Sequence, residues 1–181
     1  SYAFDVIISL FRYAFNYFSG KPLYVSVEPT RRCNADCDFC EDRRSLGAGR
    51  LTDEAESYAQ ILKYLNPIFV NFAGGEPLLR KDLEKLVQEA KEDAGVPHVS
   101  VTTNGSLLTL DRYISLSSAG LDQLNISLDF PDSQHDQSRK ISGLPALKLG
   151  FLLARINGNV TINRIISSAE RKLFNTSGQY S

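Results

Sequence analysis

Hydrophobic and polar positions alternate between two periods along most of the chain. Short runs rich in Val, Ile, Phe and Tyr are followed by stretches whose apolar residues recur every three or four positions, the pattern of strands alternating with helices. Strands are predicted at residues 23–27, 68–72, 98–102, 123–128 and 160–166, and helices at 52–65, 79–90, 110–119 and between Ser142 and Gly158. Strands that alternate with helices form parallel sheets with right-handed crossovers. The pattern therefore predicts an α/β fold of about five βα units, arranged as an open or closed barrel.

A further helix is predicted at residues 1–19. Its apolar side chains gather near one face (Phe4, Ile7, Ile8, Phe11, Ala14, Phe15 and Phe18), and Asp5, Arg12 and Asn16 fall largely on the other. A membrane span needs about 20 predominantly apolar residues without such charges. A helix lying on a membrane is not favoured either, because the polar face carries only one Arg. We expect this helix to pack on the domain.

All three cysteines of the chain lie in one stretch, EPTRRCNADCDFC, as Cys33, Cys37 and Cys40. Thiols at this spacing can reach one metal centre from a single loop, but they cannot complete the four-cysteine shell of an ordinary iron–sulfur cluster. The odd count argues against a disulfide framework. The missing ligand therefore comes from elsewhere in the protein or is not protein. One alternative is a zinc site of the Cys3His type, with His98 or His135 as its fourth ligand.

Polar motifs also follow the next three predicted strands: Gly74-Gly75-Glu76-Pro77, Thr103-Asn104-Gly105 and Ser127-Leu128-Asp129. Active sites of parallel α/β proteins gather at the C-terminal ends of the strands. Glycines let a ligand approach the backbone closely, and a neighbouring carboxylate can accept hydrogen bonds from an ammonium group. Taken singly, each motif is also explained by an ordinary turn or cap. Their order at successive strand ends favours a shared site.

The spacing C-x3-C-x2-C, with Phe39 before the last cysteine, and the GGEP, TNG and SLD runs together resemble the radical SAM superfamily. The resemblance implies a partial parallel (β/α) barrel of the radical SAM type. It also implies a 4Fe–4S cluster in which Cys33, Cys37 and Cys40 hold three irons. The amino and carboxylate groups of S-adenosylmethionine (SAM) would chelate the fourth iron.

Roles for other residues follow from the same resemblance. Gly74, Gly75 and Glu76 would contact the methionine amino group of SAM, and Pro77 would fix the turn. The remaining residues implied to face the cofactor are Phe39, Thr103, Asn104, Ser127, Asp129 and, in the fifth strand, Asn163. Residues 132–143 resemble the family's HD-x-x-R-x-x-G loop with Arg139 in the arginine place, and His135 is expected to be a surface-loop histidine.

The implied activity is reductive cleavage of SAM to a 5′-deoxyadenosyl radical that acts on an unknown substrate, such as a peptide, a lipid or a small molecule. It implies an electron donor such as a flavodoxin or ferredoxin, and no residue is assigned a catalytic role. The alternative function is an iron–sulfur or metal-binding electron-transfer module that does not cleave SAM. The family pattern has one βα unit more than this chain supplies, so we expect a C-terminally truncated chain.

Composition and charge exclude few classes of function. The chain has 181 residues, of which 43% are hydrophobic and 23% charged, enough for one sizeable core. A net charge of −1 gives no basic patch, so no DNA is expected as partner. Three clustered cysteines indicate a reducing compartment, the cytoplasm. The predicted division is an N-terminal helix at 1–20, an incomplete barrel core at 21–168, and at 169–181 a polar tail or the start of the truncated next unit.

Overall fold

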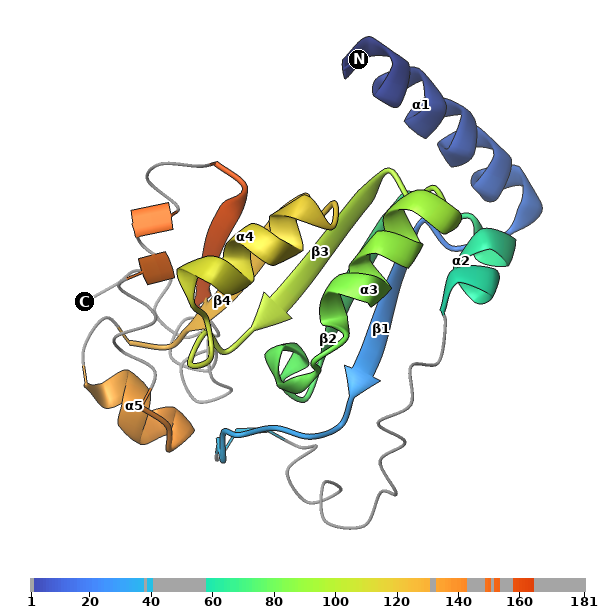
Figure 1. The fold of residues 1–181 in the computed structure, drawn as a ribbon. Helices are drawn as coiled ribbons and strands as arrows, with labels where there is room; N and C mark the ends of the chain where they lie inside the picture. Colours follow the sequence, from blue (N-terminus) through green and yellow to red (C-terminus); the bar gives the residue numbers. More distant parts are fainter. Residues whose placement is uncertain are drawn as a thin grey trace, which may run out of the picture.

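The computed structural model describes residues 2–37, 39–40, 58–130, 133–142, 149–150, 152–153 and 158–164. Within these residues, five parallel strands form one sheet whose spatial order is the order of the sequence. The strands are β1 (Tyr24–Thr30), β2 (Phe69–Gly74), β3 (His98–Thr103), β4 (Gln123–Leu128) and β5 (Val160–Arg164). The predicted α/β fold with successive parallel strands is confirmed (Figure 1).

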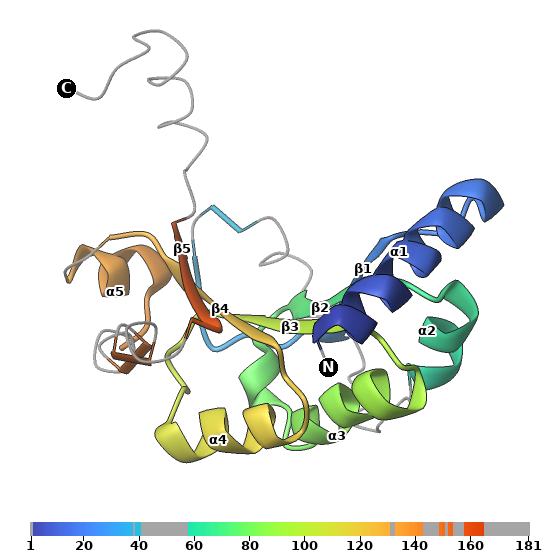
Figure 2. The same ribbon diagram turned by 90° about the horizontal axis from the view of Figure 1, so that it is seen from above.

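Helices surround the sheet, and not all of them lie on the same face (Figure 2). They are α1 (Tyr2–Ser19), α2 (Ala59–Leu65), α3 (Leu83–Gln88), α4 (Leu110–Ser118) and α5 (Gln134–Arg139), with a 3-10 turn η2 (Pro77–Leu79) and a π-helical turn η3 (Glu89–Asp93). Figure 2 shows α3 and α4 side by side on the same side of the sheet. This layer holds the core, whose strand side chains are Val27, Val70, Phe72, Val99, Val101, Leu124, Ile126 and Val160.

Because successive side chains of a strand point to opposite faces, the intervening positions form the other face of the sheet. That face is polar. Ser100 and Thr102 both donate hydroxyl hydrogen bonds to Asn71 Oδ1, at 2.9 and 3.0 Å. Gln123 Nε2 donates to Thr161 Oγ1 at 2.8 Å. The sheet therefore separates an apolar layer under the helices from a hydrogen-bonding face opposite.

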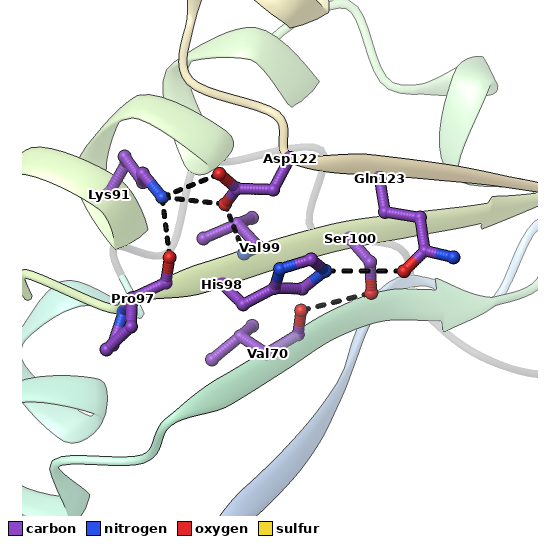
Figure 3. A network of polar contacts seen from close by, with 8 residues as sticks. All are labelled: Val70, Lys91, Pro97, His98, Val99, Ser100, Asp122 and Gln123. Carbon is purple, nitrogen blue, oxygen red and sulfur yellow. Dashed lines mark hydrogen bonds and ion pairs between the residues drawn. The ribbon is translucent and has the colours of Figure 1, made fainter. Parts of the chain in front are cut away.

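An ion pair lies at the N-terminal ends of the strands (Figure 3). Lys91 of η3 bonds both carboxylate oxygens of Asp122, at 2.9 and 2.7 Å, and its ammonium also donates to the Pro97 carbonyl at 2.7 Å. Asp122 accepts the backbone N–H of Val99 at 2.7 Å. These contacts join the helix layer to the starts of β3 and β4, far along the strands from the cysteines.

The helix α1 packs on the domain as expected, but through its polar residues. Asn16 is fully buried and its amide donates to the carbonyls of Pro22 and Asn66, at 3.0 and 2.9 Å. Arg12 donates to the carbonyl of Pro67 at 3.1 Å. Backbone carbonyls buried away from water need donors. The side chains of Asn16 and Arg12 supply these donors.

The apolar side chains of α1 are consequently left outside. Phe11 is 74% exposed and Phe18 is 86% exposed. An amphipathic helix ordinarily turns its apolar stripe to the core, so the orientation is the reverse of the usual one. The side chain of Phe4 lies outside the described part. Among the described residues, no helix is both long and apolar enough to cross a membrane.

Several predicted boundaries shift. Strand β1 runs on to Thr30, which pairs with Gly74 after an irregularity in register. Thr109 caps α4 by accepting the N–H of Arg112 at 3.2 Å, and Gly120 follows with a φ of +97°. Residues 52–57 of the first predicted core helix and 165–166 of the fifth strand lie outside the described residues, as does most of the helix predicted after residue 142. The division into 1–20, 21–168 and 169–181 stays a prediction.

Candidate cofactor site

The predicted motifs meet at the C-terminal ends of the parallel strands. In a parallel sheet all strands end on the same side, and the arrowheads of β1 and β3 in Figure 1 point to that edge. Strand β1 leads into the segment of residues 31–40, here called the cysteine loop. Strands β2, β3 and β4 lead into the GGEP, TNG and SLD runs. The structure thus brings together the four segments that the sequence singled out.

Backbone contacts join the cysteine loop to the GGEP run. Gly75 N–H donates to the Thr30 carbonyl at 3.1 Å, and Glu76 N–H donates to the Arg32 carbonyl at 2.7 Å. A Cβ on Gly75 would lie 2.0 Å from the Arg32 carbonyl oxygen. Gly74 has a φ of +106°, a conformation that residues with a side chain rarely adopt. Gly75 is thus required by the close approach of the cysteine loop itself, and Gly74 by its positive φ and by the approach of Glu28 and Thr30 in β1.

Glu76 is a fully buried carboxylate. Its Oε1 accepts the N–H of Leu78 at 3.0 Å and the hydroxyl of Thr103 at 2.7 Å. Its Oε2 accepts the N–H of Asn104 at 2.8 Å. Burial raises the pKa of Glu76, and these hydrogen bonds oppose that rise. All three donors are neutral, and the charge of Arg139, which acts from a distance, also lowers the pKa of Glu76.

The TNG turn is tied to the cysteine loop as well. Asn104 Nδ2 donates to Asn34 Oδ1 at 2.9 Å, and Asn34 Nδ2 donates to the hydroxyl of Ser106 at 2.8 Å. Asn104 Oδ1 accepts the N–H of Ser106 at 2.9 Å, which is an ordinary Asx-turn contact. Asn104 therefore forms an ordinary Asx turn and also contacts the cysteine loop.

The three cysteines differ in exposure. Cys33 is half-buried, Cys37 is buried and Cys40 is exposed, and all three are free thiols. Each of the first two thiols lies within electrostatic range of the other two cysteines. Burial raises the pKa of Cys33, and it raises the pKa of Cys37 to about 11 against the opposing effect of the Arg139 charge. Metal ligation by these thiols must therefore release protons.

The zinc alternative gains no support from the described residues. Within them, no group of three or more His, Cys, Asp and Glu side chains is placed to hold one metal ion, and this applies to the three thiols as much as to a zinc site. His98 lies at the start of β3, at the opposite edge of the sheet, where its ring stacks on Phe69 and faces the side-chain oxygen of Gln123 at 3.3 Å. His135 Nδ1 accepts the N–H of Asp129 at 3.2 Å.

A buried ion pair closes the site on the β4 side. Arg139 donates through Nε and Nη2 to the two carboxylate oxygens of Asp129, at 2.9 and 2.7 Å. Ser138 donates to the same carboxylate at 3.1 Å. The Arg139 guanidinium lies over the ring of Phe39, 5.5 Å from its centre. Both oxygens of Asp129 are thus engaged by protein donors.

Two expectations about this region are wrong. Residues 134–139 form the helix α5 where a loop was expected, and His135 is fully buried where a surface histidine was expected. The segment carries no apolar period, so its pattern gave no helix signal. The contacts of Arg139 and His135 with Asp129 hold the helix in place.

The remaining residues of the predicted motifs also lie at or near the strand ends, and fewer of their contacts are described. Ser127 is buried at the end of β4 and pairs in register with Asn163 of β5, whose side chain lies outside the description. Pro77 is buried as the first residue of η2. Sequence reasoning missed Asn34 and Arg80. Arg80 donates to the Pro29 carbonyl at 2.6 Å and so holds the end of β1. Neither residue belongs to a periodic pattern that could have revealed it.

Residues 27–173 match the sequence profile of the Radical SAM superfamily. The chain belongs to that superfamily. It is 32% identical over 160 residues to the GTP 3',8-cyclase of Staphylococcus saprophyticus, covering 81% of this chain and 47% of that protein. It is 35% identical over 119 residues to the molybdenum cofactor biosynthesis protein 1 of Dictyostelium discoideum, covering 62% and 18%. The chain spans less than half the length of these curated relatives.

Solved radical SAM structures share the fold. SuiB of Streptococcus suis, bound to S-adenosylmethionine, superposes with a TM-score of 0.64 at 22% identity, covering 86% of this chain and 37% of that one. BtrN in complex with AdoMet and 2-DOIA gives a TM-score of 0.56 at 21% identity, covering 77% and 55%. At identities this low, the superpositions establish the architecture alone. That architecture agrees with the predicted partial barrel of the radical SAM type.

The cofactors of the superfamily are a 4Fe–4S cluster and SAM, and the residues of this chain fit both. One loop supplies three thiols and the chain has no other cysteine, which leaves one iron of such a cluster without a protein thiolate. Glu76 offers a buried negative charge beside neutral donors only. A buried charge is costly unless it is paired, so an ammonium group is a suitable ligand there.

Proposed function

We propose that this chain is a radical SAM domain that binds a 4Fe–4S cluster through Cys33, Cys37 and Cys40 and SAM at the adjoining strand ends. The observation that carries the proposal is Glu76, a fully buried carboxylate whose described hydrogen-bond donors are all neutral. When bound, the reduced cluster supplies the electron that cleaves SAM to methionine and a 5′-deoxyadenosyl radical. The protein binds, orients and shields these groups.

Each strand end has a part in this proposal. Glu76 accepts the methionine ammonium, and Thr103 and Asn104 hold the carboxylate in place. Gly75 admits the cysteine loop next to it, and Gly74 makes the turn out of β2. The remaining residues of the proposed SAM site are Phe39, Pro77, Ser127, Asp129 and Asn163. We assign Asp129 an indirect part, because Arg139 and Ser138 already occupy its oxygens.

The partners follow from the chemistry. A one-electron donor such as a flavodoxin or ferredoxin would reduce the cluster, and a peptide, lipid or small molecule would give up a hydrogen atom. Free cysteines without a disulfide fit a reducing compartment such as the cytoplasm.

Anaerobic reconstitution tests cluster binding. We expect about four irons and four sulfides per chain, and loss of the cluster when Cys33, Cys37 or Cys40 is replaced by Ala. One tightly bound zinc in protein isolated without oxygen would contradict the proposal.

A second arm separates SAM chemistry from electron transfer. Glu76→Gln should keep the cluster and weaken SAM binding by roughly 10-fold or more, because it removes the charge that pairs with the ammonium. Glu84→Gln is the matched control, since Glu84 lies on α3 and pairs with Arg112 at 3.0 Å. Equal SAM binding by both variants would remove Glu76 from the SAM site, and a wild-type chain that holds the cluster but binds no SAM would favour an iron–sulfur module that does not use SAM.

A further inference from the structure

Arg139 joins three parts of the site that are separate in the sequence. Its guanidinium bonds Asp129, the residue that follows β4, through two hydrogen bonds of 2.9 and 2.7 Å. Its carbonyl accepts the N–H of Asp36 in the cysteine loop at 2.9 Å. Its guanidinium also lies 5.5 Å from the ring centre of Phe39 in the same loop. One side chain and its backbone therefore link the end of β4, α5 and the cysteine loop.

The backbone contact has a simple cause. The last carbonyls of a helix have no partner within that helix. Arg139 is the final residue of α5, and Lys140 turns the chain away with a φ of +54°. The carbonyl of Arg139 is thereby left for an outside donor, and Asp36 provides it. The cysteine loop thus caps the C-terminus of α5.

The ion pair fixes the direction of this cap. The side chains of Arg139 and Asp129 are 6% and 5% exposed, so water hardly competes with their contact. A guanidinium bound through two nitrogens is held in a plane, which a single contact would not achieve. Buried pairs of this kind add little net stability. Their contribution is to hold one geometry.

We propose that Arg139 is a positioning residue for the cluster-binding loop, and that Asp129 acts by orienting Arg139 and not by touching a cofactor. The inference rests on the proposed cluster function. The charge of Arg139 also acts through space on Cys37. Arg139 therefore affects the loop in two ways: it holds the backbone, and it places a positive charge beside the cluster ligands.

Single substitutions separate the two effects. Arg139→Gln removes a positive charge near the cluster and should lower its midpoint potential. Asp129→Asn leaves Arg139 uncompensated and should raise it. A merely structural disturbance would not move the potential in opposite directions. Arg139→Lys keeps the charge without the two-nitrogen contact, so it should restore the potential but not the loop geometry.

A readout without the cluster tests the loop directly. In the apoprotein, iodoacetamide should modify the buried Cys37 slowly, with the exposed Cys40 as an internal reference. Arg139→Lys, which keeps the charge that favours the Cys37 thiolate but loses the two-nitrogen contact, should speed the modification of Cys37 relative to Cys40. The matched control is Lys91→Gln, which breaks an ion pair of 2.7 Å at the other edge of the sheet and should leave the ratio unchanged.

The reconstituted protein supplies the second readout. Loss of iron to a chelator should be roughly 10- to 100-fold faster in Arg139→Gln than in the wild type, the range typical of residues that orient metal ligands. The double variant Asp129→Asn/Arg139→Gln buries no unpaired charge, so it should fold if a single variant does not. It should lose iron as fast as Arg139→Gln.

Three results would overturn the inference. Unchanged Cys37 reactivity in Arg139→Lys together with unchanged iron loss in Arg139→Gln would remove the positioning role. Potentials that shift in the same direction in Arg139→Gln and Asp129→Asn would remove the electrostatic one. A wild-type chain that takes up no cluster would overturn the proposed function and, with it, any part for Arg139 in cluster binding.

Discussion

Gly75→Ala tests whether the strand-end turn positions the cysteine loop. The new Cβ would lie 2.0 Å from the Arg32 carbonyl oxygen and 2.9 Å from the carbonyl carbon of Arg31. Ordinary contact begins near 3.4 Å, so one backbone must move by about 1.4 Å. Gly75 stands between β2 and the buried turn η2, whereas Arg31 and Arg32 are exposed. We expect the cysteine loop to move.

The size of the effect follows from the bonds that this movement breaks. The N–H groups of Gly75 and Glu76 lose the carbonyls of Thr30 and Arg32. Each hydrogen bond contributes about 1 kcal/mol, and residual overpacking adds about 1–3 kcal/mol. The free energy of unfolding should therefore fall by about 3–5 kcal/mol, and Tm by roughly 6–20 °C for a chain of this length.

Circular dichroism of the reduced apoprotein measures Tm, and iron analysis after anaerobic reconstitution measures cluster uptake. Gly158→Ala is the matched control, because no atom lies within 4 Å of its added Cβ. It should change the free energy of unfolding by no more than about 0.5 kcal/mol and leave cluster uptake intact. If Gly75→Ala took up as much iron as Gly158→Ala, the close approach would not position the loop.

Two further predictions concern stability. Burial raises the pKa of Glu76 above 4.5, so the folded state binds the carboxyl proton of Glu76 more tightly than the unfolded state does. The contribution of Glu76 to stability should therefore fall as pH rises from 4.5 through the folded-state pKa. Urea unfolding across pH 4.5–8 should show this fall in the wild type relative to Glu76→Gln; a constant difference between them would contradict it. Asn16→Ala removes two donors from buried carbonyls and should cost about 1–3 kcal/mol and free α1 for limited proteolysis. Ser19→Ala, at an exposed contact on the same helix, should do neither, and equal cleavage of both variants would refute the docking role of Asn16.

The sheet and the edge that carries the site could be predicted because periodicity and topology determine them together. Alternation of strand and helix patterns implies parallel strands, and parallel strands bring their ends to one edge. Strand β4 even begins and ends at the predicted residues, Gln123–Leu128. The motifs at the strand ends therefore indicate one candidate site.

The orientation of α1 could not be predicted in the same way. Periodicity shows that the helix has two faces, and the hydrophobic effect favours burial of the apolar one. The outcome depends on the carbonyls of Asn66 and Pro67, which need donors that Asn16 and Arg12 supply. That need arises from tertiary structure and leaves no trace in the pattern of α1.

The helix α5 was missed for a related reason. Six polar residues carry no apolar stripe, and a helix this short is not stable by itself. It forms against Asp129, through the guanidinium of Arg139 and the buried ring of His135. The reason for Gly75 was also different from the expected one, since the cysteine loop itself makes the close approach.

Electron paramagnetic resonance of the reduced, reconstituted chain, recorded with and without SAM, tests the central claim most directly. If three cysteines leave one iron open and Glu76 receives the ammonium, SAM should change the spectrum of the cluster. The change should require a higher SAM concentration in Glu76→Gln than in Glu84→Gln. A fully assembled cluster whose spectrum stays the same at saturating SAM would contradict the claim and favour an iron–sulfur module without SAM chemistry.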